Sequence, residues 1–256
     1  MRLEGTMKET RLQELKNYIK SLRNVSNEEL CKEMNVSMST LRRDLQVLQD
    51  EGFIRKVYGG VAYNDTSMLT SFQYRTGQEP EGKNAVGQLA ARLIEDEDTI
   101  FVDSGTTTPY ILNYITAHNV TVLTNNAAIL AAASDFPQLD IYALPGLFYS
   151  ETMSFFSPEA IDLLSTFKIN KAFLAASGFS YRGATNNAAY EYTLKKYVAE
   201  HIDNAYLCIS VNKFDISRVI TYCSPEDLKG IVTDQKPRDE IVKMLLDKGI
   251  ELYYAQ

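Results

Sequence analysis

Hydroxyl and guanidinium side chains lie close together between residues 37 and 43. Ser37, Ser39 and Thr40 are followed by the adjacent pair Arg42 and Arg43. Hydroxyls near a helix N-terminus bind phosphate oxygens, and arginine forms paired hydrogen bonds with guanine in the major groove of DNA. Two adjacent arginines alone indicate only a solvated helix face, so the prediction of a DNA contact depends on the surrounding elements.

A second group of small polar residues follows four successive β-rich segments. Any one of these strand ends alone is typical of a helix cap and turn. In a parallel α/β sheet, however, strand ends with amides, hydroxyls and a carboxylate suit a phosphate or sugar hydroxyls, so we expect a small ligand there. The residues are Asp103, Ser104, Gly105, Thr106 and Thr107 after the first segment, Thr124, Asn125 and Asn126 after the second, Gly146 after the third, and Ser177 and Gly178 after the fourth.

Three further side chains could supply charge to that ligand. Glu191 and Lys195 are four residues apart and therefore neighbours on one helix face, and Lys213 follows a later β-rich segment. The alternative for the first two is a surface ion pair worth a few tenths of a kcal/mol, and for Lys213 an ordinary surface lysine. The residues alone leave these alternatives open.

Helical periodicity predicts a helix-turn-helix that positions the first group. Apolar residues at steps of three and four indicate a helix over 10–22, and Ser26 with Glu29 forms a capping box for a short helix through residue 34. Ser37 caps a third helix that Gly52 can end. The residues expected on the buried faces are Leu12, Leu15, Ile19, Leu22, Leu41, Leu45 and Leu48.

A β-hairpin is expected directly after these helices. Residues 53–58 alternate apolar and basic side chains, turn at two glycines and continue over 61–63. Together the elements predict a winged helix-turn-helix domain over residues 1–63, in which the third helix enters the major groove and the arginine pair contacts DNA. The further DNA-binding candidates are Ser26, Arg55, Lys56 and Tyr58.

The remainder of the chain predicts an α/β domain over residues 83–256. Residues 64–82 are polar, lack a helical or strand period and are expected to form a linker. Beyond them, strands alternate with helices, which indicates a mainly parallel sheet with helices on both faces. The expected strands are 99–103, 120–124, 140–144, 172–176, 205–210 and 230–233, and the expected helices are 84–94, 108–115, 127–133, 188–200 and 238–246.

Composition limits the class of protein. The chain has 256 residues, of which 45% are hydrophobic, and it lacks the apolar run of about 18 residues that a membrane span requires. Its formal charge is about +2 over residues 1–61 and about −9 beyond them, so a basic front part can act on nucleic acid despite the net charge of −7. Three cysteines and two histidines without ligand spacing predict neither a disulfide framework nor a metal site, and no cofactor is expected. We expect a soluble, cytoplasmic protein.

The segment VSMSTLRRDL over residues 36–45, with Leu48, Gly52 and the sequence YGGV over 58–61, resembles the DNA-binding signature of the DeoR family of bacterial transcription regulators. The back domain resembles that family's effector domain, which is similar in fold to ribose-5-phosphate isomerase and typically senses phosphorylated sugars. Tyr58, Pro145 and Ser210 depart from residues common in the family. The resemblance implies that the lysines meet the phosphate and the carboxylates the hydroxyls, in a cleft lined by Asp103, Gly105, Thr106, Thr107, Thr124, Asn125, Asn126, Gly178, Glu191, Lys195 and Lys213.

The predicted function is a repressor of a carbohydrate-utilisation operon, controlled by a phosphorylated sugar and not an enzyme. We expect it to bind double-stranded operator DNA as a homodimer or homotetramer, without a membrane partner. One alternative is a sugar-phosphate isomerase or deaminase that uses Asp103 or Glu191 as the general base and Lys195 as the phosphate anchor. Another is a DNA-binding protein whose cleft has lost its ligand.

Overall fold

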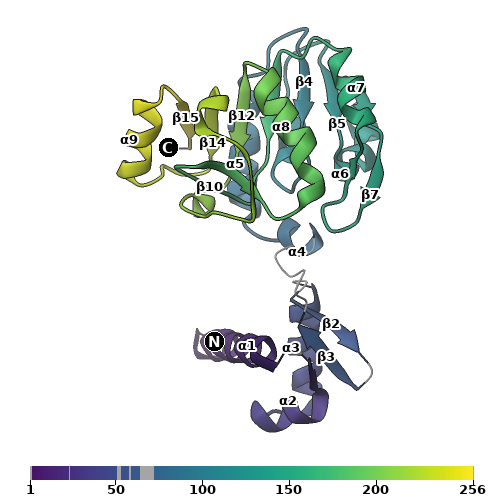
Figure 1. Cartoon of the computed structure of the whole chain (residues 1–256), viewed down its shortest axis with the longest axis vertical. Helices are drawn as coiled ribbons and strands as arrows, with labels where there is room; N and C mark the ends of the chain where they lie inside the picture. Colours follow the sequence, from purple (N-terminus) through teal and green to yellow (C-terminus); the bar gives the residue numbers. More distant parts are fainter. Residues whose placement is uncertain (1, 23, 51–52, 58, 64–71, 256) are drawn as a thin grey trace. The chain divides into compact units, whose positions relative to one another are not determined.

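The computed structural model describes residues 2–22, 24–50, 53–57, 59–63 and 72–255, without the side chains of residues 2–9 and of Arg55. Internal contacts divide the chain into two compact units, Met1–Arg75 and Thr76–Gln256 (Figure 1). Each unit has its own hydrophobic core.

The first unit contains the expected helices. They are α1 (Arg2–Leu22), α2 (Asn27–Glu33) and α3 (Met38–Asp50), and Leu15, Ile19, Leu41, Leu45 and Leu48 are buried between them. Leu12 is partly buried against this core. The prediction for Leu22 was wrong, because this last residue of α1 lies beyond the packed part of the helix and is 45% exposed.

The wing is a three-stranded antiparallel sheet. Strands β2 (Ile54–Val57) and β3 (Gly60–Tyr63) form the predicted hairpin, and the unexpected strand β1 (Asn24–Ser26) pairs with β3. A three-residue strand is too short to show a period, so the sequence did not reveal it. The expected helix end at Gly52 and wing contact at Tyr58 lie outside the described residues.

The segment expected to be a linker is partly helical. Residues 64–71 lie outside the described residues, but α4 (Phe72–Thr76) and the start of α5 (Pro80–Ala91) fall within 72–82. The irregular structure predicted for 72–82 was therefore wrong. Phe72 is buried, and Pro80 stands near the start of α5, where its missing N–H leaves no helical hydrogen bond unmade.

The second unit is built on a seven-stranded parallel sheet in the order β15-β14-β12-β9-β4-β5-β6. Six strands coincide closely with the predicted ones, and the predicted parallel α/β architecture is confirmed. The edge strand β15 was not predicted, because its half-buried residues lack a strong apolar pattern. The strands are β4 (Thr99–Val102), β5 (Thr121–Thr124), β6 (Asp140–Ala143), β9 (Lys171–Leu174), β12 (Ala205–Cys208), β14 (Gly230–Thr233) and β15 (Glu251–Tyr254).

Helices cover both faces of this sheet, as predicted (Figure 1). Phe101 and Leu174 pack on one face, against α7 (Glu159–Ser165), α8 (Tyr192–His201) and α9 (Asp239–Asp247). The neighbouring residues on the strands, among them Ile100, Val102 and Phe173, pack on the other face. They contact α5, α6 (Ala127–Ala131) and the 3-10 helix η1 (Thr108–Tyr114). Alternate side chains of one strand thus bury opposite faces of the sheet.

Two small antiparallel sheets, neither of them predicted, complete the second unit. One is the hairpin of β7 (Leu147–Tyr149) and β8 (Ser154–Phe156), and the other contains β10 (Gly178–Ser180), β11 (Gly183–Asn186) and β13 (Ile220–Cys223). Of the described helices, none combines the length and apolar character needed to cross a membrane. The remaining short 3-10 helices are η2 (Ala133–Asp135), η3 (Ala189–Glu191), η4 (Val211–Lys213) and η5 (Pro225–Asp227).

Candidate functional site

The outer surface of α3 presents hydroxyls followed by cations. The Ser37 Oγ caps the helix by accepting from the Thr40 amide at 3.3 Å, and it lies 2.9 Å from the Ser39 Oγ and 3.0 Å from the Thr40 Oγ1. The side chains of Arg42 and Arg43 are exposed to solvent. A hydroxyl-rich helix start followed by two solvated guanidinium groups is the surface that the DNA-contact prediction requires.

Asp44, the next residue, faces inward instead. It is 2% exposed, and the Arg11 guanidinium of α1 donates to both of its carboxylate oxygens, from Nε at 2.7 Å and from a terminal nitrogen at 3.1 Å. This hydrogen bonding to Asp44 raises the pKa of Arg11. The paired bonds tie α1 to α3, so one polar side chain of the arginine-rich segment supports the fold while two remain available to a partner.

The other front candidates have different positions. The Ser26 Oγ accepts from the Glu29 amide at 3.1 Å as the N-cap of α2, and the Glu29 carboxylate accepts from the Tyr18 hydroxyl. Exposed Lys56 on the wing donates to Gln46 of α3 at 3.1 Å, so this wing cation lies beside the third helix. The Arg55 side chain and Tyr58 lie outside the described residues.

In the second unit, the strand order reverses between β4 and β9, and we call the position beyond the carboxyl ends of these two strands the switch point. The chain runs from β4 outward through β5 to β6, then returns to β9 on the other side of β4 and continues through β12 to β15. Connections therefore leave β4 and β9 in opposite directions, and ligands in such sheets bind beyond the carboxyl ends of these strands. Asp103 follows β4, and Ala175 and Ser177 follow β9.

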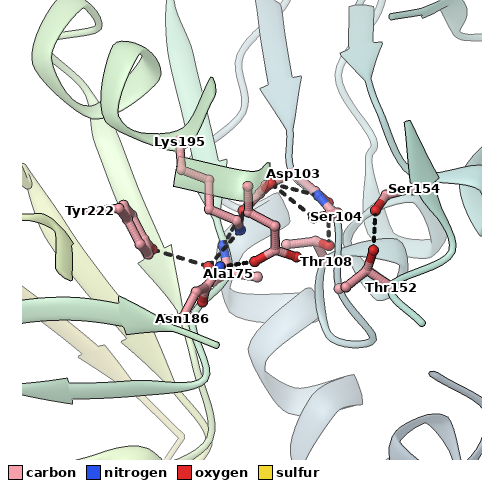
Figure 2. Close-up of polar contacts among 12 residues, drawn as sticks. Asp103, Ser104, Thr108, Thr152, Ser154, Ala175, Asn186, Lys195 and Tyr222 are labelled. Carbon is pink, nitrogen blue, oxygen red and sulfur yellow. Dashed lines mark hydrogen bonds and ion pairs between the residues drawn. The ribbon is translucent and has the colours of Figure 1, made fainter. Parts of the chain in front are cut away.

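A buried ion pair occupies this position (Figure 2). The Asp103 Oδ1 accepts from the Ser104 amide at 2.7 Å, and its Oδ2 accepts from the Ala175 amide at 2.8 Å and from the Lys195 Nζ. The same Nζ donates to the Ala175 carbonyl at 2.9 Å. Asp103 is 0% and Lys195 1% exposed, so the alternative that Lys195 belongs to a surface pair is wrong.

Glu191 stands four residues before Lys195 and is also buried. Its carboxylate accepts from the Asn186 amide group, whose oxygen accepts from the Ser177 amide at 3.1 Å. The Tyr222 hydroxyl donates to the Ala175 carbonyl at 3.0 Å. Burial, together with the nearby Cys223, Asp103 and Glu191, raises the pKa of Tyr222 well above its ordinary value, so the phenol stays protonated and acts as a donor.

Two polar residues after β5 maintain the loops. The Asn126 side chain donates to the Gly105 carbonyl at 3.0 Å and accepts from the Ala128 amide at 3.0 Å, which joins the ends of β4 and β5 and caps α6. The Thr124 Oγ1 donates to the Val102 carbonyl at 2.6 Å. Both side chains are already satisfied by the protein.

Asn125 and Thr107 are different, because among the described residues their buried side-chain polar atoms have no hydrogen-bond partner. Asn125 is 0% exposed, and neither its amide nitrogen nor its oxygen has a partner among the described residues. The Thr107 Oγ1 likewise has none, and this residue is 2% exposed. A buried polar group without a partner costs about 1–3 kcal/mol. These groups follow the adjacent strands β5 and β4, and together they present both hydrogen-bond donors and acceptors.

The glycine candidates allow close approaches between segments. Gly105 has φ +131°, and a Cβ there would lie 3.0 Å from that of Ala175. A Cβ at Gly178 would lie 2.4 Å from the Ile216 carbonyl oxygen. Gly146 is exposed and packs against the Phe156 backbone at the base of the β7–β8 hairpin. Gly146 is thus placed by that hairpin, whereas Gly105 lies beside the buried ion pair.

The remaining candidates lie beside the same strand ends. Thr106 is buried in the loop after β4, and the Lys213 Nζ donates to the Ala176 carbonyl at 3.0 Å. Lys213 is half-buried rather than an ordinary surface lysine. Ser210, a departure from the family, is also buried.

Several residues near the site were missed by sequence reasoning. Asn186 and Tyr222 belong to the small sheet that was not predicted. The adjacent polar pair Asn186 and Asn187, just before the Glu191 helix, is the sequence feature that could have indicated a polar site there. The β7–β8 hairpin bonds to the end of β5, because the Phe155 amide donates to the Asn125 carbonyl at 2.9 Å. Thr152 and Ser154 of this hairpin segment share a hydroxyl contact of 2.6 Å (Figure 2).

Two family models match the chain. Residues 11–67 match the DeoR-like helix-turn-helix domain, and residues 78–235 match the DeoR C terminal sensor domain. The HTH-type transcriptional regulator IolR of Bacillus subtilis is 38% identical over 97% of this chain and 100% of its own. The HTH-type transcriptional repressor GlcR of the same organism is 26% identical over 97% of this chain and 96% of its own. The glycerol-3-phosphate regulon repressor of Escherichia coli is 26% identical over 89% of this chain and 91% of its own.

Solved structures show a weaker likeness. A ribose-5-phosphate isomerase in complex with phospho-erythronic acid is 16% identical and covers 53% of this chain and 54% of its own, with a TM-score of 0.39. Ribose 5-phosphate isomerase A of Methanocaldococcus jannaschii is 12% identical and covers 54% of this chain and 55% of its own, with a TM-score of 0.40.

Proposed function

Because the chain belongs to the DeoR family of DNA-binding transcriptional regulators, we propose that it represses a carbohydrate-utilisation operon under the control of a phosphorylated sugar. The names of two relatives, the glycerol-3-phosphate regulon repressor and the lactose phosphotransferase system repressor of Staphylococcus epidermidis, support this assignment. Each of them aligns along almost its whole length.

The observation that carries the ligand proposal is the unsatisfied, buried amide of Asn125. An amide offers two donors and an acceptor, and a sugar hydroxyl both donates and accepts, so one diol can satisfy both ends of the side chain. The unpaired Thr107 hydroxyl adds another contact for such a ligand. A sugar therefore recovers hydrogen bonds that the ligand-free protein lacks.

The DNA side of the proposal rests on α3 and the wing. Operator duplex would be contacted at base edges by Arg42 and Arg43 and at phosphates by Ser37, Ser39 and Lys56. We propose a homodimer or homotetramer, because helix-turn-helix proteins read paired half-sites one or more helical turns apart. Ligand binding would change operator affinity through a coupling energy of about 1–3 kcal/mol.

The first experiment is a thermal-shift screen of the full chain with ribose 5-phosphate, glucose 6-phosphate, fructose 6-phosphate, glycerol 3-phosphate and their unphosphorylated forms. The proposal expects stabilisation by a phosphorylated compound and a change of roughly 5- to 150-fold in the affinity for DNA from upstream of the protein's own gene. If no phosphorylated compound stabilises the protein, the sensor proposal fails. Turnover of the bound compound would support the isomerase alternative, although both Asp103 oxygens are already engaged.

Asn125→Leu provides a sharper test of the pocket. Leucine has a similar volume but removes the unsatisfied amide, so we expect the ligand-free protein to become as stable as wild type or more stable. Binding of the compound identified in the screen should be lost. A variant that is equally stable and still binds with wild-type affinity would contradict the assignment of Asn125 to the ligand.

A further inference from the structure

One of the two lysines expected to meet the ligand's phosphate, Lys195, is already neutralised. The Lys195 Nζ is held by the Asp103 carboxylate and the Ala175 carbonyl, and both charged side chains are almost fully buried. A phosphate dianion entering there would have to lose its hydration and displace the carboxylate. A cation nearer to solvent and without a carboxylate partner is a better phosphate anchor.

Arg218 has these properties. Its side chain is exposed, and its Nε donates to the Ser177 carbonyl at 3.4 Å. Within the described part of the chain, no carboxylate pairs with this guanidinium, so its terminal nitrogens can take two oxygens of one phosphate. No sequence pattern points to this arginine, since it lies in an irregular segment before β13.

The backbone of that segment is firmly attached to strands β10 and β11. The Arg218 amide donates to the Thr185 Oγ1 at 2.9 Å, and the neighbouring Ser217 Oγ donates to the Ser180 Oγ at 3.1 Å. Ile216 packs so closely on Gly178 that a Cβ at this glycine would clash with its carbonyl oxygen. The position of the Arg218 backbone is therefore determined by contacts with β10 and β11, the two strands that follow Ser177.

Successive carbonyls after β9 bring this arginine close to the ion pair. The Ala175 carbonyl accepts from Lys195, the Ala176 carbonyl from Lys213, and the Ser177 carbonyl from Arg218. Ala175 and Ser177 are two residues apart, roughly 7 Å in extended chain, so the Lys195 Nζ and the Arg218 Nε lie within roughly 14 Å of each other. A pentose or hexose phosphate with a hydrogen bond of about 3 Å at each end can bridge such a separation.

We propose that Arg218 binds the phosphate of the effector at the solvent-exposed side of the switch point, with the sugar hydroxyls directed inward toward Asp103. This assignment deepens the proposed function and rests on it. The exposed position limits the desolvation cost of the dianion, and the planar guanidinium matches two phosphate oxygens. The buried Lys195–Asp103 pair then recognises uncharged hydroxyls.

Isothermal titration calorimetry on the full chain tests this orientation. The probe is the tightest-binding compound of ribose 5-phosphate, glucose 6-phosphate, fructose 6-phosphate and glycerol 3-phosphate. We expect Arg218→Gln to weaken its binding by at least about tenfold and Arg218→Lys to weaken it less, because lysine keeps the charge but not the fork. The matched control is Arg182→Gln, which removes an exposed arginine that contacts Tyr181 and should leave binding unchanged.

The outcomes separate this inference from the function on which it rests. If wild type binds a phosphorylated compound and Arg218→Gln binds it equally well, the inference is overturned and the sensor function stands. Equal weakening by Arg218→Gln and Arg182→Gln would also overturn it, because the effect would then reflect only surface charge. If wild type binds none of the four compounds, the proposed function fails as well. Thermal melting of each variant checks that it is folded.

Discussion

At the scale of single residues, the buried carboxylates of Asp44 and Asp103 are each held by a cation from a distant segment. Asp44 accepts both bonds from Arg11, and Asp103 accepts from Lys195, 92 residues away. Removing one member of a buried pair leaves the other charge without compensation, which costs more than the pair itself contributes. Conservative substitutions at these positions therefore separate structural charges from those available to partners.

Lys195→Met should lower the free energy of unfolding by about 3–5 kcal/mol, because it leaves the Asp103 carboxylate buried and unpaired. Urea denaturation followed by circular dichroism measures the change. Lys196→Met is the matched control, since that lysine is largely solvated, pairs with Glu200 at 3.6 Å and lies over the Tyr192 ring, so its loss should change stability little. A loss below about 1 kcal/mol for Lys195→Met would contradict the role of the pair in the fold.

Arg42→Ala and Arg43→Ala should each weaken operator binding by about tenfold to a hundredfold without changing the melting temperature. Both side chains are solvent-exposed, so their removal uncovers no core. Arg11→Met, in contrast, should lower the free energy of unfolding by about 2 kcal/mol, because the buried Asp44 carboxylate loses its partner. Gel shifts and thermal melting of the three variants test the distinction. Wild-type operator affinity in both alanine variants would remove the DNA contact from this face.

At the scale of secondary-structure elements, the wing depends on a close approach of β1 to β3. A Cβ at Gly60 would lie 2.3 Å from the Val25 carbonyl oxygen, which belongs to the backbone of the paired strand and cannot move aside cheaply. Gly59, one residue earlier, has φ +76° but no atom within 4 Å of such a Cβ. Gly60 therefore permits the pairing of β1 with β3, whereas Gly59 permits the left-handed conformation of the turn.

Gly60→Ala should separate β1 from β3, lower the melting temperature of the front unit and weaken operator binding. Gly59→Ala should cost only the strain of a left-handed residue, about 1–2 kcal/mol. Thermal melting and gel shifts of the two variants provide the comparison. Equal effects of both substitutions would show that strand pairing is not the limiting feature of the wing.

At the scale of the whole molecule, the two units have separate cores and should unfold separately. The described core residues of the front unit and those of the back unit form distinct clusters. We expect two calorimetric transitions, one lowered by Arg11→Met and the other by Lys195→Met. A phosphorylated sugar should raise only the transition that Lys195→Met lowers. A single calorimetric transition that is shifted by Arg11→Met, by Lys195→Met and by the sugar would contradict the independence of the two units.

The sequence by itself determined the family and the sequence of the main elements. Spacing of three and four residues placed the helices of the front unit, and short apolar runs placed six of the seven strands of the parallel sheet. These signals are local, because each element must bury an apolar face that its own residues supply. The exposure of Arg42 and Arg43 could be predicted for the same reason, since they lie between Leu41 and Leu45, which must point inward.

Only the tertiary structure decided which polar residues contact one another. Glu191 and Lys195 are neighbours in sequence spacing, yet Lys195 pairs with Asp103. Arg218 donates to the Ser177 carbonyl from a segment with no pattern. Asp44 directly follows the two exposed arginines and is nevertheless buried against Arg11. Such contacts depend on strand order and on short unpatterned segments, which bring distant residues together through packing rather than through any local preference.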